Sequence, residues 1–294
     1  MTHVWEERRP SRLKVLHTYS KRAIRWRRNS SPYLSGDLFS DMSDISLYPP
    51  RFRGTQPGLS EIQSAKVIFC PSDKLSLFLD EYHRDISARV IICGNSDHEF
   101  LDLPPKIPPS IRQLFLQNSF ISDHPLVTTL PIGIENFRWG VNGNPKNLSM
   151  GGSWVQRKNE ILIGPFGLTH PIRNEVRIEF LNQTEGIKFI SNRIEPSDYA
   201  RLSKEVRYVA AVRGNGVDTH RHWETLYRGT IPIIIEDGWS AGIENLTLPF
   251  LKVAAWAPEQ LRAFIRNGDD LGFSPEKIPA LWWPYWKKLI DSYL

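Results

Sequence analysis

Residues 212–239, VRGNGVDTHRHWETLYRGTIPIIIEDGW, combine glycines, arginines and a glutamate directly ahead of an apolar strand. Glycine lets the backbone approach a ligand closely, and the first turn of a helix attracts an anion. Arg221 beside such a helix start suits a diphosphate. The carboxylate of Glu224 can accept two hydrogen bonds from a pair of vicinal hydroxyls. A nucleoside diphosphate joined to a sugar offers both groups and therefore fits this segment.

The elements that must position these groups are a strand and the helix that follows it. Open α/β sheets bind ligands at the carboxyl ends of their strands, and three residues would leave such an end: Arg213, Gly214 and Asn215. Either Asp218 or Thr219 can cap the following helix, which would place Arg221 and Glu224 on one face toward the ligand. The alternative is a capped helix on which Arg221 and Glu224 form only a surface ion pair.

A second turn of the same kind, PFGLTHPIR at 165–173, follows another predicted strand. Thr169, His170 and Arg173 would lie where a helix begins. We therefore predict that they add to the anion-binding edge. The alternative is an ordinary strand-to-helix turn in which Thr169 is a cap.

The segment RGNGVDTHRHWETLYRGTIPIII, followed by LPFLKVAAW, resembles the C-terminal segment of the exostosin-like glycosyltransferases. That family typically shows an Arg-Gly, a downstream Arg, a Glu a few residues later, and then Gly-x-Ile-Pro-Val before a Leu-Pro-Phe segment. The resemblance is best within residues 213–256 and extends more loosely to LPIGIEN at 130–136 and GPFGLTHPIR at 164–173. Its core, Glu224 to Pro232, is moderately specific, because related families share it.

This resemblance implies a GT-B fold, in which two Rossmann-like, doubly wound domains face each other across a cleft. It also implies a nucleotide-sugar donor and, in most members, an inverting transfer. Glu224 would hold the donor ribose, and Arg213 and Arg221 would lie near the diphosphate. The chain departs from the exostosins in its short length and in the absence of a membrane anchor, which leaves the donor and the acceptor open.

An inverting transfer needs a base that removes the proton of the acceptor hydroxyl, and that base should come from the domain opposite the donor. Asp97 and His98 in CGNSDHEF, and Asp37 in LSGDLFSD, are the candidates. His17, at the end of the first predicted strand, is a further possibility that is better explained by packing. The alternative for each candidate is a residue of a turn or a helix cap.

The sequence gives no reason to expect a metal or a cofactor beyond the nucleotide-sugar co-substrate. No Asp-x-Asp pattern occurs, and the nearest pair of acidic residues is Asp269–Asp270. Because GT-A enzymes usually need such a motif to hold a divalent ion, its absence favours the GT-B interpretation. Arginines and helix dipoles would then stabilise the diphosphate.

Short apolar runs alternate with amphipathic segments, as in α/β proteins with buried parallel sheets. The predicted strands are 13–20, 65–72, 88–96, 112–119, 128–134, 160–167, 187–194, 206–214, 230–237 and 250–256. The predicted helices are 72–84, 170–184, 195–205, 218–229 and 257–268. Two successive strand–helix arrays indicate two doubly wound domains.

A segment rich in Gly, Asn and Ser, residues 139–159, has no periodicity and is typical of a linker. We therefore predict an acceptor-binding Rossmann-like domain at 1–150 and a nucleotide-sugar-binding domain at 151–275. A closing helix would occupy 276–294, where an apolar stripe includes Trp282, Trp286 and Ile290. The alternative for this aromatic segment is a helix that contacts a membrane interface or a partner.

Composition suits a globular protein of 294 residues with 40% hydrophobic residues and a net charge of +5. No apolar run is long enough to cross a membrane and the first residues lack a signal-peptide pattern, so we expect a cytoplasmic protein. Cys70 and Cys93 are expected to be buried thiols rather than a disulfide. The basic segment 1–30 could contact a membrane peripherally or be a solvated terminus. No nucleic-acid motif accompanies it.

These features together predict a glycosyltransferase, a hexosyl- or pentosyltransferase of polysaccharide biosynthesis. It would move a sugar from a nucleotide-sugar donor to a hydroxyl of a glycan or lipid-linked acceptor without a metal. The main alternative is a non-catalytic nucleotide- or glycan-binding module of the same fold. A nucleic-acid-associated protein that uses the basic N-terminal segment is a third possibility with weaker support.

Overall fold

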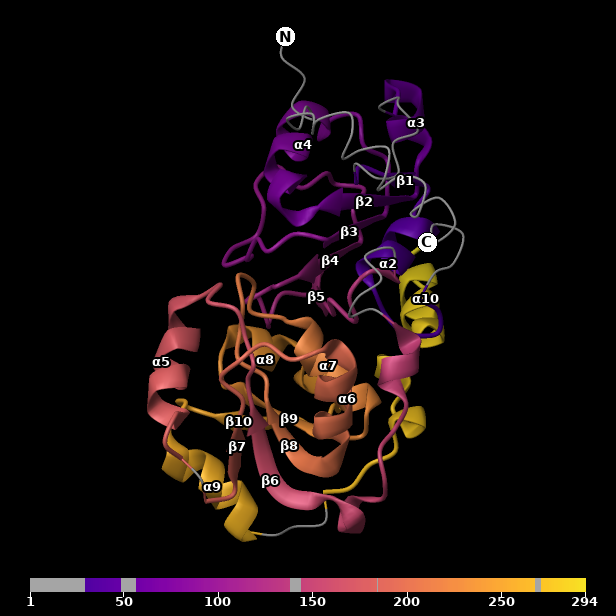
Figure 1. The fold of residues 1–294 in the computed structure, drawn as a ribbon. Helices are drawn as coiled ribbons and strands as arrows, with labels where there is room; N and C mark the ends of the chain where they lie inside the picture. The colour runs from indigo at the N-terminus through magenta and orange to yellow at the C-terminus, as the bar shows by residue number, and fades with distance from the viewer. Residues whose placement is uncertain (1–29, 49–56, 138–143, 184, 268–270) are drawn as a thin grey trace, which may run out of the picture.

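The computed structural model describes residues 30–48, 57–137, 144–183, 185–267 and 271–294. Two parallel β-sheets form the framework of these residues (Figure 1). Within these residues the first sheet has five strands in the order β1-β2-β3-β4-β5. They are Ile45–Ser46 (β1), Val67–Pro71 (β2), Val90–Gly94 (β3), Gln113–Gln117 (β4) and Val127–Leu130 (β5). Every residue of β2, β3 and β4 is buried, which explains why this part of the sequence carries nearly continuous apolar runs.

The second sheet also has five parallel strands within the described residues, in the order β10-β9-β8-β6-β7. They are Lys158–Ile163 (β6), Ile187–Phe189 (β7), Val206–Ala210 (β8), Ile231–Ile235 (β9) and Leu251–Val253 (β10). The chain goes from β6 outward to β7 and then returns to place β8 on the other side of β6. This reversal leaves a crevice at the carboxyl ends of β6 and β8, where open α/β sheets bind ligands.

Helices cover both sheets. They are α2 (Gly36–Met42), α3 (Leu59–Ser64), α4 (Leu75–Tyr82), α5 (Pro171–Phe180), α6 (Pro196–Glu205), α7 (His220–Tyr227), α8 (Gly238–Gly242), α9 (Pro258–Asn267) and α10 (Trp283–Asp291). Short 3₁₀ turns are η2 (Ser72–Lys74), η4 (Pro145–Leu148), η5 (Trp154–Gln156), η6 (Glu244–Leu246), η7 (Pro275–Lys277) and η8 (Pro279–Leu281). In Figure 1, α5 and α9 lie on one side of the second sheet, and α6 and α7 lie on the other.

One of the hydrophobic clusters that contain residues of both halves of the molecule lies between the two sheets. It contains Phe69 and Ile92 from the first sheet together with Ile234 from the second sheet and Trp239 from α8. Trp286 of α10 belongs to the same cluster and is fully buried. The halves therefore share apolar packing in addition to the polar contacts described below.

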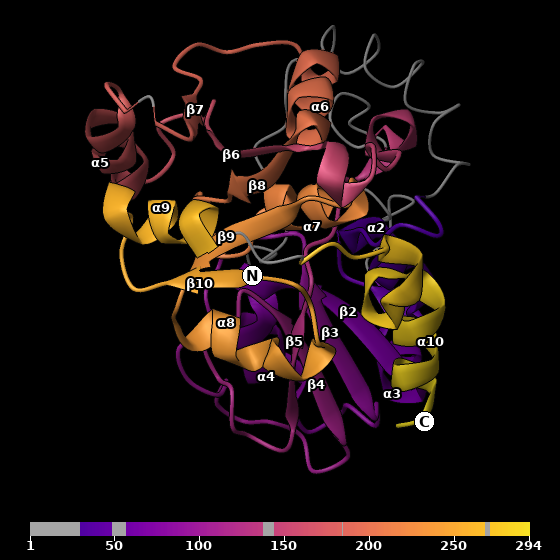
Figure 2. The ribbon, with the colours of Figure 1, turned by 90° about the horizontal axis from the view of Figure 1, so that it is seen from below.

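Helix α10 packs beside the first sheet, although it follows the second sheet in the chain (Figures 1 and 2). The rings of Phe39 in α2 and Trp286 in α10 are 6.1 Å apart and nearly perpendicular. The indole nitrogen of Trp286 donates to the carbonyl of Ala280 at 2.8 Å. The aromatic stripe of the C-terminal segment is thus used for packing within the chain.

Several helices and strands were not predicted from the sequence, and some predictions fall outside the described residues. The short elements α2, β1, α3 and α8 were not predicted, and Asp37, a base candidate whose alternative was a turn or helix-cap residue, lies in the first turn of α2. The predicted strand 13–20 with His17, the basic segment up to residue 29, Asp269–Asp270 and residues 139–143 of the predicted linker lie outside the described residues. The division of the chain at residues 150 and 275 stays a prediction.

The thiols of Cys70 and Cys93 occupy paired positions of β2 and β3. Both are free and buried, as the sequence predicted. Burial raises the pKa of both thiols far above the ordinary range.

None of the described helices is long and apolar enough to cross a lipid bilayer.

Gly133, just after β5, has a backbone conformation that only glycine adopts easily, with φ of +67°. A Cβ at this position would overlap the carbonyl group of Leu34, which is backbone and cannot rotate away. We expect Gly133→Ala to lower the free energy of unfolding by about 1–3 kcal/mol, because the strained backbone and the close contact both persist. Urea unfolding of the variant measures the change.

Gly167→Ala is the matched control for Gly133→Ala. A Cβ at Gly167 would meet its nearest atom, Cγ2 of Thr169, at 3.9 Å, an ordinary van der Waals distance. This variant should unfold at nearly the same urea concentration as the parent protein. Equal stabilities of the two variants would show that the turn at Gly133 relaxes without cost.

Candidate functional site

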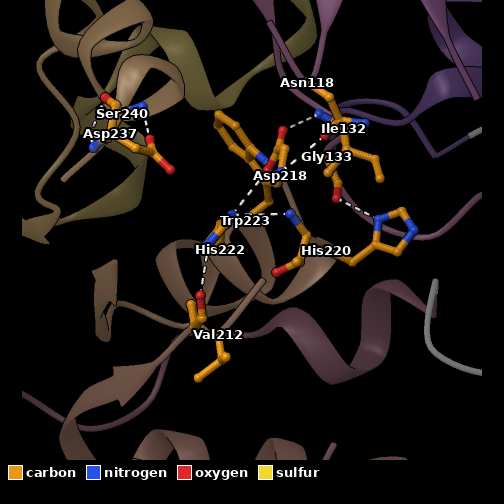
Figure 3. A network of polar contacts seen from close by, with 12 residues as sticks. Asn118, Ile132, Gly133, Val212, Asp218, His220, His222, Trp223, Asp237 and Ser240 are labelled. Atoms are coloured by element: carbon orange, nitrogen blue, oxygen red, sulfur yellow. Dashed lines mark hydrogen bonds and ion pairs between the residues drawn. The ribbon is translucent and has the colours of Figure 1, made fainter. Parts of the chain in front are cut away.

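The carboxyl edges of the two sheets face each other, and the segment before α7 lies between them (Figure 3). The backbone N–H of Ile132, after β5, donates to Oδ2 of Asp218 at 2.8 Å. The backbone N–H of Asp218 in turn donates to Oδ1 of Asn118, after β4, at 3.0 Å. These contacts hold the two parallel-sheet units edge to edge. The predicted α/β fold, two doubly wound Rossmann-like units facing each other, is confirmed.

Asp218 has a different environment from the one predicted. Its carboxylate is fully buried, and it accepts a hydrogen bond from the indole nitrogen of Trp223 at 2.8 Å in addition to the one from Ile132. Oδ1 also lies 3.0 Å from Nδ1 of His222. The expectation that Asp218 caps α7 or binds a donor is corrected, because internal donors surround both of its oxygens.

Thr219, the other predicted cap, is the N-cap residue of α7 by position. The backbone N–H of Thr219 donates to Nδ1 of His222 at 3.1 Å. One residue later, Nδ1 of His220 lies 2.8 Å from the carbonyl of Gly133 in the first unit. The first turn of α7 is therefore fixed against the first unit, and the helix begins at His220, two residues after the predicted start at 218.

Two further contacts cross between the units. Arg213 forms an ion pair with Glu99, and both side chains are about one quarter exposed. Beside it, Nδ2 of Asn215 donates to Oδ2 of Asp97 at 3.1 Å. Arg213 and Asn215 thus bind acidic groups of the first unit in this structure. They are not directed at the crevice between β6 and β8.

That crevice holds a cavity of about 550 Å³. Four arginines and one carboxylate line it: Arg173, Arg193, Arg221, Arg228 and Glu224. The rest of the lining includes the turn after β6 at Pro165–Gly167, Tyr199 of α6, and Thr219 and His220 at the start of α7. We call this space the arginine cavity. Its excess of positive charge suits an anion with more than one negative charge.

One face of α7 supplies the charged wall of the arginine cavity. Arg221, Glu224 and Arg228 are spaced at i, i+3 and i+7, which places them on the same side of a helix. Nη2 of Arg228 lies 3.4 Å from Oε2 of Glu224, and both side chains are nearly buried. Nη2 of Arg221 instead donates to the carbonyl of Pro165 at 2.5 Å. The pair of Arg221 and Glu224 expected as the alternative does not form.

Tyr199 supports both of these arginines from α6. The guanidinium carbons of Arg221 and Arg228 lie 4.8 Å and 5.7 Å from its ring centroid. Burial raises the pKa of the Tyr199 phenol, so the ring stays neutral at physiological pH. The stacked ring orients two cations toward one cavity without neutralising either of them.

Arg173 connects the two predicted turns. Nε donates to the carbonyl of Arg213 at 2.8 Å, and Nη1 donates to Oγ1 of Thr169 at 2.9 Å. Burial, followed by the charge of Arg221, lowers the pKa of Arg173 to about 10. Gly214 lies beside it, and a Cβ there would crowd Nη2 of Arg173 at 3.1 Å. Arg173 therefore lines the cavity while it also ties the turn after β6 to the end of β8.

His170 and Thr169 do not line the arginine cavity. His170 is the N-cap of α5, where its Nδ1 accepts from the backbone N–H of Ile172 at 3.3 Å. Burial and then the charge of Arg213 lower the pKa of His170. The capping residue of this turn is thus the histidine and not the threonine considered in the sequence.

None of the three base candidates lines the arginine cavity. Asp97 is exposed and contacts Asn215, and His98 is exposed with its ring packed at 5.0 Å on Phe100. The backbone N–H of Asp37 donates to Oδ1 of Asn136 at 2.8 Å. Asp97 contacts Asn215 of the second unit. Asp37 lies in the first turn of α2, and Asn136 connects it to Asn95 because Nδ2 of Asn136 donates to Oδ1 of Asn95 at 2.9 Å.

Sequence reasoning missed Arg193, Tyr199 and Arg228. A signal existed for Arg228, because an arginine four residues after Glu224 repeats the helix face already assigned to the site. Arg193 follows the short strand β7, and nothing local distinguishes it from a solvent-exposed arginine. Within the described residues no group of three or more His, Cys, Asp or Glu side chains could hold a metal ion.

No family model matches the chain, and no curated protein matches it. Among solved structures, the chain is similar to AviGT4, a glycosyltransferase involved in avilamycin A biosynthesis, with 12% sequence identity and a TM-score of 0.36. The similarity covers 85% of this chain and 96% of that chain. So distant a similarity identifies neither a family nor an activity. Membership of the exostosin-like family stays a prediction from the sequence.

Proposed function

We propose that the protein is a glycosyltransferase that binds its nucleotide-sugar donor in the arginine cavity. The observation that carries the proposal is the lining of this cavity: four arginines around a single carboxylate at the point where the strand order of the second sheet reverses. In an open α/β sheet this point is the usual ligand site. A nucleoside diphosphate joined to a sugar matches both kinds of charged group.

The roles follow from the chemistry of the side chains. Arg221 and the first turn of α7 would bind the diphosphate, with Arg228 and Arg193 adding positive charge. Glu224 would accept hydrogen bonds from the ribose hydroxyls. Arg213 would act only after its ion pair with Glu99 opens, because the two side chains are bonded to each other in this structure.

The acceptor would bind between the units and the first unit would supply the base. We keep Asp97, His98 and Asp37 as the candidates, with Asp97 favoured by its contact with Asn215. The proposed transfer is inverting and metal-independent, to a hydroxyl of a glycan or lipid-linked acceptor. We also propose a cytoplasmic protein that contacts a membrane peripherally through its basic N-terminal segment.

One observation favours a second candidate function, a non-catalytic nucleotide-binding module. No base candidate reaches the arginine cavity, so the described residues of the first unit bring no proton acceptor against a bound donor. Release of sugar from a nucleotide-sugar donor separates the two functions, since a module of this kind would bind the donor and release nothing.

Thermal denaturation with UDP, GDP, CDP, dTDP and ADP, each with and without EDTA, tests the donor site. A ligand that binds only the native state raises the melting temperature. We expect one diphosphate to raise it equally with and without EDTA. No rise with any of the five would contradict the proposal, and a rise that EDTA removes would overturn its metal independence.

Arg221→Gln should weaken the binding of that diphosphate by about tenfold, because one charge-assisted hydrogen bond is lost. The fold should survive, since the side chain is partly exposed and contacts the carbonyl of Pro165 and two aromatic rings among the described residues. Isothermal titration measures the affinity. Arg201→Gln, on the exposed side of α6, is the control and should bind the diphosphate as the parent does.

A further inference from the structure

A second cavity, of about 490 Å³, lies at the carboxyl ends of β8, β9 and β10. Apolar side chains form most of its lining: Phe120, Ile172, Val217, Ile234, Ile235, Trp239 and Trp256. Phe120 follows β4 of the first unit, whereas the other six residues come from the second half of the chain. We call this space the aromatic cavity. Its position between the two units is the position expected for an acceptor.

The polar groups of the aromatic cavity gather around Arg213. His170 and Asp237 both line the cavity: burial lowers the pKa of His170 and raises the pKa of Asp237, while the positive charge of Arg213 opposes protonation of both. The same segment leads to the arginine cavity, because the carbonyl of Arg213 accepts a hydrogen bond from Arg173 at 2.8 Å. The two cavities are therefore neighbours at one edge of the second sheet, and Arg173 and Arg213 form the wall between them. The charged end of the aromatic cavity, at Arg213, lies next to this wall.

Two tryptophans of the cavity lining each have a buried indole N–H without a hydrogen-bond acceptor among the described residues. They are Trp239 and Trp256, which are 1% and 8% exposed. A buried N–H without a partner lowers stability, and a ligand oxygen that reached it would recover that free energy. Aromatic faces with a few N–H donors suit a flat ring that carries oxygen atoms.

We propose that the aromatic cavity binds the ring of a phenolic acceptor, with the reacting hydroxyl at the Arg213 end next to the arginine cavity. This inference rests on the proposed function and narrows its acceptor class. An aliphatic lipid would offer no oxygen to the indole nitrogens. A saccharide would place many hydroxyls against isoleucine, valine and alanine side chains, where they would lose hydrogen bonds to water.

The test is direct binding of 7-hydroxycoumarin to the full chain. Isothermal titration and the quenching of tryptophan fluorescence measure this binding. We expect saturable binding, and no detectable binding of methyl β-D-glucoside or farnesol at the same concentrations. Absence of saturable coumarin binding overturns the proposal. Tighter binding of the glucoside or of farnesol overturns it in favour of a saccharide or an aliphatic acceptor.

Variants at the cavity wall locate the binding site. Ala255 lines the cavity and is exposed, so Ala255→Leu fills the space without disturbing the core. We expect it to weaken coumarin binding by about tenfold or more, because the added side chain occupies the site of the ring. Ala241→Leu, on the exposed side of α8 and outside the cavity lining, should bind coumarin as the parent does. Equal affinities of the two variants would place the coumarin elsewhere and overturn the proposal.

Failure of the acceptor inference can be distinguished from failure of the proposed donor site. Titration with the five diphosphates examines the arginine cavity, and Ala255→Leu should leave diphosphate affinity unchanged. Diphosphate binding without coumarin binding would overturn the acceptor inference alone. Coumarin binding that Ala255→Leu weakens, without any diphosphate binding, would support the aromatic cavity while contradicting the proposed donor site.

Discussion

Asp218→Ala should lower the free energy of unfolding by about 3–5 kcal/mol, the largest loss of stability that we expect from one substitution. The carboxylate is fully buried and accepts hydrogen bonds from the backbone of Ile132 and the indole of Trp223. Alanine would leave both donors buried without a partner. It would also remove the contact with His222 and the link between the two units. Urea unfolding monitored by circular dichroism measures the loss.

Two comparisons make the Asp218→Ala result specific. Asp218→Asn keeps one oxygen acceptor and should lose less stability than the alanine variant. Asp198→Ala, on the exposed surface of α6, should unfold as the parent does, because its ion pair within the described residues is a 3.9 Å contact with an exposed Arg201. A loss below about 1 kcal/mol for Asp218→Ala would mean that water replaces the carboxylate and that the contact between the two units does not depend on Asp218.

Glu224→Gln should produce the largest change in ligand binding. If Glu224 holds the ribose, the neutral amide loses charge-assisted hydrogen bonds, and affinity for a ribonucleoside diphosphate should fall by about 10- to 150-fold. Affinity for the 2′-deoxy form should fall less, because that ligand offers only one of the two hydroxyls. Titration with UDP, GDP and ADP and with their 2′-deoxy forms measures both quantities.

Glutamine is preferred to alanine at this position for a structural reason. Glu224 lies 3.4 Å from the nearly buried Arg228, and Glu224→Ala would leave that guanidinium without its acidic partner. A loss of folding would then be mixed with a loss of binding. Glu205→Gln, at the end of α6, is the matched control. If Glu224→Gln weakens the ribo and deoxy ligands equally, Glu224 does not contact the 2′-hydroxyl.

The sheets were predictable from the sequence because buried parallel strands are apolar on both faces. Runs such as Val67–Pro71 and Val90–Gly94 have that property, and each is bounded by turn residues. Helix α8 was missed because its five residues, Gly238–Gly242, are too few to show a helical period. The start of α7 was predicted within two residues, because Thr219 precedes a helical pattern.

The individual roles within residues 212–239 were harder to predict. Asp218 and Glu224 are both acidic residues beside apolar ones, and the sequence alone makes them equivalent. They differ because Ile132, 86 residues earlier, donates to Asp218, whereas Glu224 is directed into a cavity. Contacts between segments far apart in the chain decide whether such a polar group supports the structure or is available to a ligand.

The position of α10 has a consequence for synthesis on the ribosome. Its buried Trp286 and Ile290 complete the same hydrophobic cluster as Phe69 and Ile92 of the first sheet. All five strands of the second sheet must be translated before that helix emerges. The first unit therefore waits with part of its apolar surface uncovered during translation, which is the interval in which a nascent chain is open to chaperones and to aggregation.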